Sequence, residues 1–160
     1  MHLLIWTVRV LGMVAVSLAA GGVGSLIVNS SALEWYNSLH KPALTPPARV
    51  FGYIWAALYL LMGIAAGMIW NVPVFLSRVR TSLAIFLLQL ALNVGWVVLF
   101  FGFKLTGWAL VDAVILWALV VVTAYLFYVQ SRAAGIFLWP YLAWVTFAIY
   151  LNAGIVFLNR

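Results

Sequence analysis

Cysteine and charged side chains are what this sequence lacks most. The chain contains no cysteine, which excludes disulfide bonds and thiolate chemistry. Only 6% of its 160 residues are charged and 68% are hydrophobic, whereas soluble domains are roughly half apolar and a quarter charged. With two histidines and two carboxylates in the whole chain, we expect no metal centre built from protein ligands. The composition therefore excludes a water-soluble fold and indicates a membrane protein.

The few charges are mostly positive and are spread along the chain. Eight lysines and arginines give a formal net charge of +6. Nucleic-acid-binding proteins gather such residues into a stripe or patch, and this sequence shows no such cluster. We therefore expect no nucleic-acid partner and interpret the cations as anchors at the membrane surface. They divide evenly between the two sides of the expected bundle, so the positive-inside rule leaves the orientation in the membrane undetermined.

Long apolar stretches divide the chain into membrane spans. A transmembrane helix needs about 20 predominantly apolar residues. Residues 109–122 are apolar on every face, whereas the strands of a membrane barrel would alternate over segments of about ten residues. We expect an all-α bundle of five transmembrane helices that forms a single membrane domain, residues 1–160. The five helices are predicted at residues 3–28, 51–71, 79–103, 106–129 and 134–158.

The connection between the first two spans, residues 29–50, is the only long one in this prediction. It contains the neighbouring aromatic residues Trp35 and Tyr36. It also contains three prolines, namely Pro42, Pro46 and Pro47. Proline fixes φ and lowers the entropy of the free chain, so this segment is suited to hold the two rings over the mouth of the bundle. We expect residues 29–50 to form a lid.

Part of the lid is predicted to be helical. A short helix is expected at residues 33–39, with Ser30 or Ser31 as its N-cap and Glu34 near its positive end. The helix is expected to stop before Pro42, because the residue that precedes a proline avoids helical geometry.

Two amides are predicted to lie on one face of the third span. Gln89 and Asn93 are four residues apart, so their side chains project from the same side of a helix. Amides inside a bilayer face protein rather than lipid. A hydrogen bond between helices, worth about 0.6–2 kcal/mol, is the first interpretation, and a polar contact to a ligand in the bundle is the alternative.

Asp112 is a carboxylate within the fourth span. An intramembrane carboxylate is a functional candidate by default. Asp112 is expected only a turn or two from the membrane surface, where it can stay hydrated or pair with Lys104 or an arginine. We therefore favour a structural role. A proton relay would need a chain of such groups, which this sequence does not contain.

Large rings and small residues give two further signals. The rings of Trp55, Tyr141 and Trp144 either pack in the bundle and at its interfaces or form a wall suited to a flat aromatic ligand. Small residues four apart let helix backbones approach closely, either inside the monomer or at the seam of a homodimer. The candidates for such a seam are Gly63 with Gly67 and Ala91 with Gly95.

Three blocks of the sequence resemble the translocator protein family, TspO/MBR, also known as the peripheral-type benzodiazepine receptor family. The first block comprises WYNSLHKP at residues 35–42, TPP at 45–47 and GYIWAALY at 52–59. The second lies in the third span, with QL at 89–90, LN at 92–93, Trp96 and FFG at 100–102. The third lies in the fifth span, with PYLAW at 140–144, FA at 147–148 and LN at 151–152. The resemblance covers nearly the whole chain.

This resemblance implies a five-helix bundle, commonly a homodimer, in the lipid bilayer. It implies a cavity that binds protoporphyrin IX or a haem-like tetrapyrrole, or other flat aromatic molecules, with no required cofactor. The function implied is tetrapyrrole sensing, transport or regulation. By motif position the ligand-binding residues would be Trp35 and Tyr36 in the lid, Trp55 and Asn93 as polar contacts, and Trp96, Trp144, Ala148 and Leu151 in the walls.

The resemblance also leaves two alternatives open. Trp55 and Trp144 correspond to tryptophans that bacterial relatives are thought to use in light-dependent porphyrin breakdown, so they are the candidate catalytic residues of an enzyme. A lipid or sterol transporter is the other alternative, but transporters are usually built on repeats and broken helices. Sterol-binding relatives carry a tyrosine and an arginine just after the residues matching 151–152. Here residues 153–157 are AGIVF, so we do not expect strong sterol binding at this position.

The end of the chain suggests the type of member. No long basic tail follows Leu158. This predicts a bacterial-type protein in a membrane of the cell envelope.

Overall fold

Helices make up nearly all of the structure, a computed structural model that describes residues 2–73 and 76–160. In that part of the chain five segments are long and apolar enough to cross a membrane, which confirms the predicted fold class. Three of them are the single helices α1 (His2–Ile27), α3 (Ala48–Trp70) and α5 (Thr106–Gln130). The others are α4 (Leu76–Val97) continued by the π-helix η1 (Val98–Gly102), and α6 (Arg132–Phe137) continued by α7 (Trp139–Leu158).

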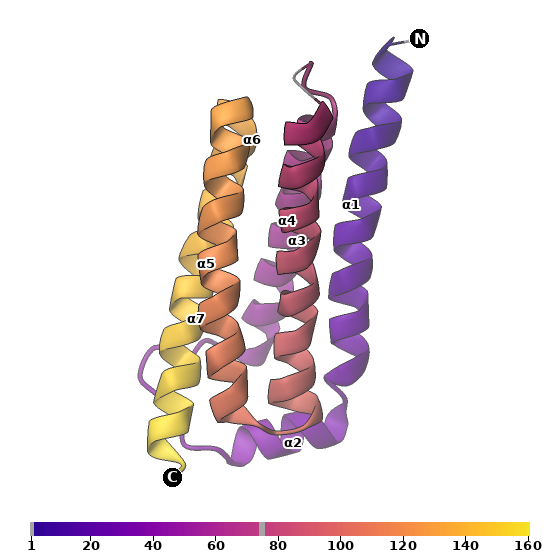
Figure 1. Cartoon of the computed structure of the whole chain (residues 1–160). Helices are drawn as coiled ribbons and strands as arrows, with labels where there is room; N and C mark the ends of the chain where they lie inside the picture. Colours follow the sequence, from indigo (N-terminus) through magenta and orange to yellow (C-terminus); the bar gives the residue numbers. More distant parts are fainter. Residues whose placement is uncertain (1, 74–75) are drawn as a thin grey trace.

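The five spans stand side by side, and the short helix α2 (Ser30–Ser38) lies across one end of the bundle (Figure 1). The C-terminus lies at the same end as α2, and the N-terminus lies at the opposite end. Helix α1 packs mainly on α3, and α5 packs on α4 and α7. At most 39% of the apolar window of each span is buried in the bundle. Most residues of each span are therefore at least partly exposed, as in a protein that is surrounded by lipid.

The fifth span differs from its prediction as one unbroken helix over residues 134–158. It begins at Arg132 and is interrupted at Leu138, which ends α6 and precedes α7. Pro140 lies in the first turn of α7, where its missing N–H removes no intrahelical hydrogen bond. The second and third spans also begin three residues earlier than predicted, at Ala48 and Leu76.

The lid contains the expected short helix, but its first turn differs from the prediction. Helix α2 begins at Ser30, and Asn29 rather than a serine is its N-cap. The Asn29 side chain accepts a hydrogen bond of 2.9 Å from the backbone N–H of Ala32, which satisfies one of the free donors of the first turn. Because the helix starts earlier than expected, Glu34 lies beyond the first turn. Its predicted interaction with the positive end of the helix is therefore wrong.

Two glycines allow α1 and α3 to approach closely. A Cβ added to Gly67 would lie 2.5 Å from the Cα of Val10, and one added to Gly63 would meet the backbone of Val14 even more closely. Of the two uses considered for this glycine pair, the structure shows packing inside one chain.

We predict that Gly67→Ala lowers the stability of the bundle, because the new methyl group forces the α1 backbone away from α3. The expected loss is about 1–3 kcal/mol, the usual cost of overpacking. Thermal unfolding in detergent measures it. Gly52→Ala is the matched control, since no atom lies within 4 Å of the added Cβ and alanine favours a helix over glycine. Equal melting temperatures for both variants would contradict this account of the α1–α3 contact.

Candidate ligand-binding site

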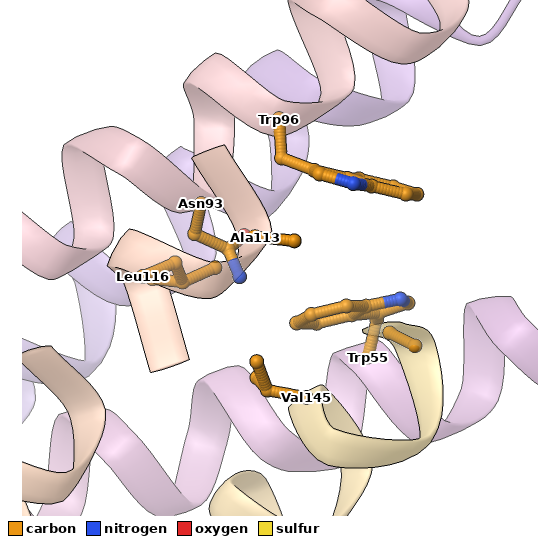
Figure 2. Close-up of a pocket in the computed structure, with 7 residues that line it drawn as sticks. Trp55, Asn93, Trp96, Ala113, Leu116 and Val145 are labelled. Atoms are coloured by element: carbon orange, nitrogen blue, oxygen red, sulfur yellow. The ribbon is translucent and has the colours of Figure 1, made fainter. Parts of the chain in front are cut away.

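A small pocket lies between α3, α4, α5 and α7. Its lining comprises Trp55, Asn93, Trp96, Ala113, Leu116, Val145 and Ala148. Four of the eight predicted ligand-binding residues are therefore brought together, from three different helices. Figure 2 shows the rings of Trp55 and Trp96 facing each other across the gap, with the amide of Asn93 at its side. The cavity measures about 10 Å³, which is about the room needed by one water molecule.

Asn93 lies at the centre of a buried hydrogen-bond network that joins three helices. Its Oδ1 accepts a hydrogen bond from the Tyr59 hydroxyl, and its Nδ2 donates to the Tyr141 hydroxyl at 3.1 Å. Tyr141 in turn donates to Oε1 of Gln89 at 2.8 Å. The network is the helix-to-helix contact that the sequence suggested, and it places the same amide at the pocket.

A second amide orients the ring of Trp96. The indole Nε1 of Trp96 donates a 2.9 Å hydrogen bond to Oδ1 of Asn152, and Nδ2 of Asn152 donates to the carbonyl of Thr106 at 2.9 Å. Asn152 is 1% exposed. Our sequence reasoning did not include Asn152 or Tyr59 among the site residues. The criterion that selected Asn93, an amide within a membrane span, applies equally to Asn152.

Trp55 and Trp144 have different surroundings. The ring of Trp55 packs against Tyr59 at 5.7 Å and Tyr141 at 6.2 Å between centroids. The ring of Trp144 packs against Phe51 at 5.6 Å, and Trp144 is not among the residues that line the pocket. Its Nε1 is buried and has no hydrogen-bond partner within residues 2–73 and 76–160. Leu151 is also buried and is not a lining residue.

The two lid aromatics reach the pocket through one intervening ring. Trp35 contacts Phe100 edge-on at 5.6 Å. Tyr36 contacts Phe100 at 6.2 Å and Phe101 at 5.7 Å. Phe100 is stacked on Trp96 at 4.9 Å with an interplanar angle of 20°. The lid rings are therefore in the second layer, behind the Trp96 wall of the pocket.

The π-helix η1 provides the surface on which the lid rests. It spans Val98–Gly102 and closes with a 2.9 Å hydrogen bond from the N–H of Phe103 to the carbonyl of Val98. The wider turn accommodates an extra residue, and the consecutive Phe100 and Phe101 both contact α2 rings. Single π-turns inside α-helices occur frequently at functional sites.

The remainder of the lid is tied to the end of α7. The backbone N–H of His40 donates to Oδ1 of Asn159 at 2.9 Å, and Nδ2 of Asn159 donates to the carbonyl of His40 at 2.8 Å. Pro42 packs against Gly154, where an added Cβ would lie 2.6 Å from the proline ring. These contacts agree with the expectation of a stiff lid. Burial against η1 raises the pKa of the Tyr36 phenol, which therefore stays neutral.

Asp112 forms no ion pair with Lys104, which was one of the three environments that the sequence allowed for it. Its Oδ1 faces the α4 backbone, 3.5 Å from the position of a Cβ built on Gly95. Its Oδ2 is buried without a hydrogen-bond partner in the described part of the chain. The ammonium of Lys104 lies instead over the ring of Trp35. The glycine at position 95 thus leaves room for a carboxylate between α4 and α5.

The residues suggested for a homodimer seam fall into two groups. Gly63 and Gly67 are covered by α1, so the prediction that a second copy packs on them is corrected: the α1 backbone already occupies their face. Ala91 is exposed on α4, and Gly95 is partly buried next to Asp112. Homodimerisation itself stays a prediction.

The fold and the pocket define a class of protein, a five-span membrane bundle with an aromatic site near a helical lid. The model of the TspO/MBR family matches residues 13–158. The chain is 37% identical to Tryptophan-rich protein TspO of Chlorobaculum tepidum over 91% of this chain and 92% of that protein. It is 38% identical to Translocator protein of Homo sapiens over 81% and 78% of the two chains. It is 37% identical to Tryptophan-rich sensory protein of Cereibacter sphaeroides over 79% and 77%.

The chain therefore belongs to the TspO/MBR family, and it is a multi-pass membrane protein. This membership confirms the resemblance that the three sequence blocks indicated.

We predict that Tyr141→Phe destabilises the bundle, because removal of one hydroxyl leaves Nδ2 of Asn93 and Oε1 of Gln89 without their partner. The expected loss is about 1–3 kcal/mol, the cost of buried polar groups left unpaired. Tyr125→Phe is the control, since Tyr125 is 66% exposed. Thermal unfolding in detergent compares the two, and an equally small effect of both would show that the network does not hold the helices together.

Proposed function

We propose that the protein binds porphyrins such as protoporphyrin IX in the pocket between α3, α4, α5 and α7. The observation that carries the proposal is the arrangement of Trp55, Trp96 and Asn93 (Figure 2). Two indole faces oppose each other across the cavity, and one amide lies beside them. Small-molecule sites generally combine an apolar, aromatic lining with a few placed polar groups. A planar ring system is the ligand shape that fits between two opposed indoles.

Binding requires the bundle to open, because the cavity is much smaller than a porphyrin. Sites for drug-sized ligands measure about 300–1,000 Å³, against about 10 Å³ here. The ring of Trp96 can move away only if Phe100, which stacks on it, and the lid rings on Phe100 move as well. The lid is therefore proposed to govern entry and exit. Opening the lid costs free energy, and this cost lowers the net affinity of the protein for its ligand.

The biological role that we propose is tetrapyrrole sensing, transport or regulation in a bacterial cell envelope membrane. Support for the role comes from a bacterial relative named for a sensory role and a human relative named for a translocator role. Support for the location comes from the two bacterial relatives. Sterol is not proposed as the ligand, because residues 153–157 lack the tyrosine and arginine of the proposed sterol motif.

We expect wild-type protein in detergent to show tryptophan quenching that saturates with protoporphyrin IX, and Asn93→Ala to bind about tenfold more weakly. One lost hydrogen bond of about 1.4 kcal/mol corresponds to that factor. Asn71→Ala is the control, since Asn71 caps α3 far from the pocket residues. Absence of saturable quenching in the wild type would refute the proposed function, and equal affinity of Asn93→Ala would remove Asn93 from the site.

A second candidate function is light-dependent porphyrin breakdown, in which Trp55 and Trp144 act as redox-active rings beside an excited porphyrin. The observation in its favour is that Trp55 contacts the rings of Tyr59 and Tyr141. Adjacent aromatic rings of this kind can pass an oxidising equivalent away from a bound chromophore.

For this candidate we expect Trp55→Phe and Trp144→Phe to abolish the loss of porphyrin absorbance under illumination in air, while affinity in the dark changes only a few-fold. Phenylalanine preserves much of the packing but not the redox chemistry of indole. Trp139→Phe is the control, because Trp139 is 61% exposed on α7. Parallel loss of binding and turnover would mean that these tryptophans serve packing only.

A further inference from the structure

Each aromatic ring of the lid carries a lysine ammonium on its face. Nζ of Lys41 lies 4.8 Å from the centroid of the Tyr36 ring. Nζ of Lys104 lies 5.7 Å from the centroid of the Trp35 ring. The two lysines come from different parts of the chain, one just after α2 and the other between η1 and α5. Two cations therefore lie on the two lid rings, and those rings are separated from Trp96 of the pocket by Phe100 alone.

The backbone at Lys104 is unusual. Lys104 has a φ of 58°, a left-handed conformation that is uncommon for residues other than glycine. Such strain is found mainly at sites where the surrounding structure requires it, and functional sites are prominent among them. Here the turn connects η1 to α5, and glycine would adopt it without strain. Lysine in this position presents an exposed ammonium beside the lid.

The second lysine is attached to the lid itself. Besides its contact with Tyr36, Nζ of Lys41 donates hydrogen bonds to the carbonyls of Asn37 at 3.1 Å and Leu39 at 3.2 Å. These carbonyls lie at the C-terminal end of α2, where a cation is favourable. The partners of Lys41 and Lys104 are thus ring faces and backbone carbonyls. Such partners bind an ammonium less strongly than a carboxylate in a charge-assisted hydrogen bond.

The lid end of the bundle has an excess of positive charge. Lys41, Lys104, Arg49 and Arg160 all lie at this end, and Glu34 of α2 is the acidic residue of the lid. Fields of this kind attract anions to the mouth of a site. A ligand with an apolar ring system and two carboxylates on one edge would match both parts of this region, the indoles of the pocket and the ammoniums on the lid rings.

We propose that Lys104 and Lys41 bind the two carboxylates of a planar dicarboxylate such as protoporphyrin IX, each exchanging its ring face for a carboxylate. The proposal rests on the proposed function and adds an orientation to it. The carboxylate edge of the ligand lies at the lid, and the opposite edge lies between Trp55 and Trp96. Porphyrins without free carboxylates are then poorer ligands.

The test compares protoporphyrin IX with its dimethyl ester, by tryptophan quenching in detergent. In the wild type we expect the diacid to bind at least about tenfold more tightly than the ester, one tenfold step being the usual size of one good polar contact. Lys104→Met and Lys41→Met are expected to weaken diacid binding by about three- to tenfold each and to leave ester binding unchanged. Lys104→Arg keeps the charge and is expected to restore diacid binding.

Arg160→Met is the matched control. Arg160 also lies at the lid end and over an aromatic ring, that of Phe157 at 4.4 Å, but it does not contact the lid rings. Its loss removes the same formal charge, so unchanged diacid binding in this variant separates a local contact from a general effect of net charge. An equal loss in Arg160→Met and Lys104→Met would overturn the assignment of a carboxylate site.

The remaining outcomes separate this inference from the proposed function. If diacid and ester bind the wild type equally well, the lysines are not carboxylate receptors, while porphyrin binding stands. If Lys104→Met weakens binding of the diacid and of the ester equally, the lysine only packs the lid. The inference then fails, while porphyrin binding stands. If neither compound binds, the proposed function fails and the inference with it. Lys41→Met also removes hydrogen bonds to α2, so Lys104→Met, which removes none of those bonds, decides any disagreement between the two variants.

Discussion

The hydrogen bonds of Asn93 are the interactions on which the rest of the bundle depends. In an apolar bundle an amide must find partners inside the protein, since lipid offers none. Asn93 on α4 meets Tyr59 on α3 and Tyr141 on α7, and these bonds fix how the three helices face each other. The pocket lies at this junction because the same helices place Trp55, Trp96 and Val145 around the amide. The amide that joins the three helices is therefore also one of the groups that line the pocket.

The pocket and the lid are coupled through stacked rings. Trp96 is held on one side by Asn152 and on the other by Phe100, and Phe100 also carries Trp35 and Tyr36 of the lid. A ligand that displaces Trp96 must disturb this stack. The lid also has contacts that do not involve the stack, with Gly154 of α7 and with Asn159, which caps that helix. The lid is therefore held at two places, by the ring stack under α2 and by the end of α7 at residues 40–42.

The sequence predicts some of these features and not others, for physical reasons. Five helical spans follow from hydropathy, because only helices and closed barrels satisfy backbone groups in lipid and the unbroken apolar runs exclude barrel strands. The position of Asn93 at the core follows from the cost of exposing an amide to lipid. The π-helix at 98–102 has no such signal, because an α-helix and a π-helix place the same apolar residues in the membrane. Likewise Gly63 and Gly67 indicate a close contact but not its partner, and only the structure shows that α1 occupies their face.

Asp112 illustrates how the bundle accommodates charge. A carboxylate in a membrane span normally pairs with a cation or stays hydrated, yet here Lys104, the nearest cation in sequence, is turned toward the lid. The space left by Gly95 receives the carboxylate between α4 and α5. Lys104 forms no ion pair with Asp112, the carboxylate of the neighbouring helix α5, and its charge lies at the lid, over the ring of Trp35. The small residue at 95 thus accommodates Asp112 inside the bundle, while the left-handed turn at 104 presents Lys104 to the lid.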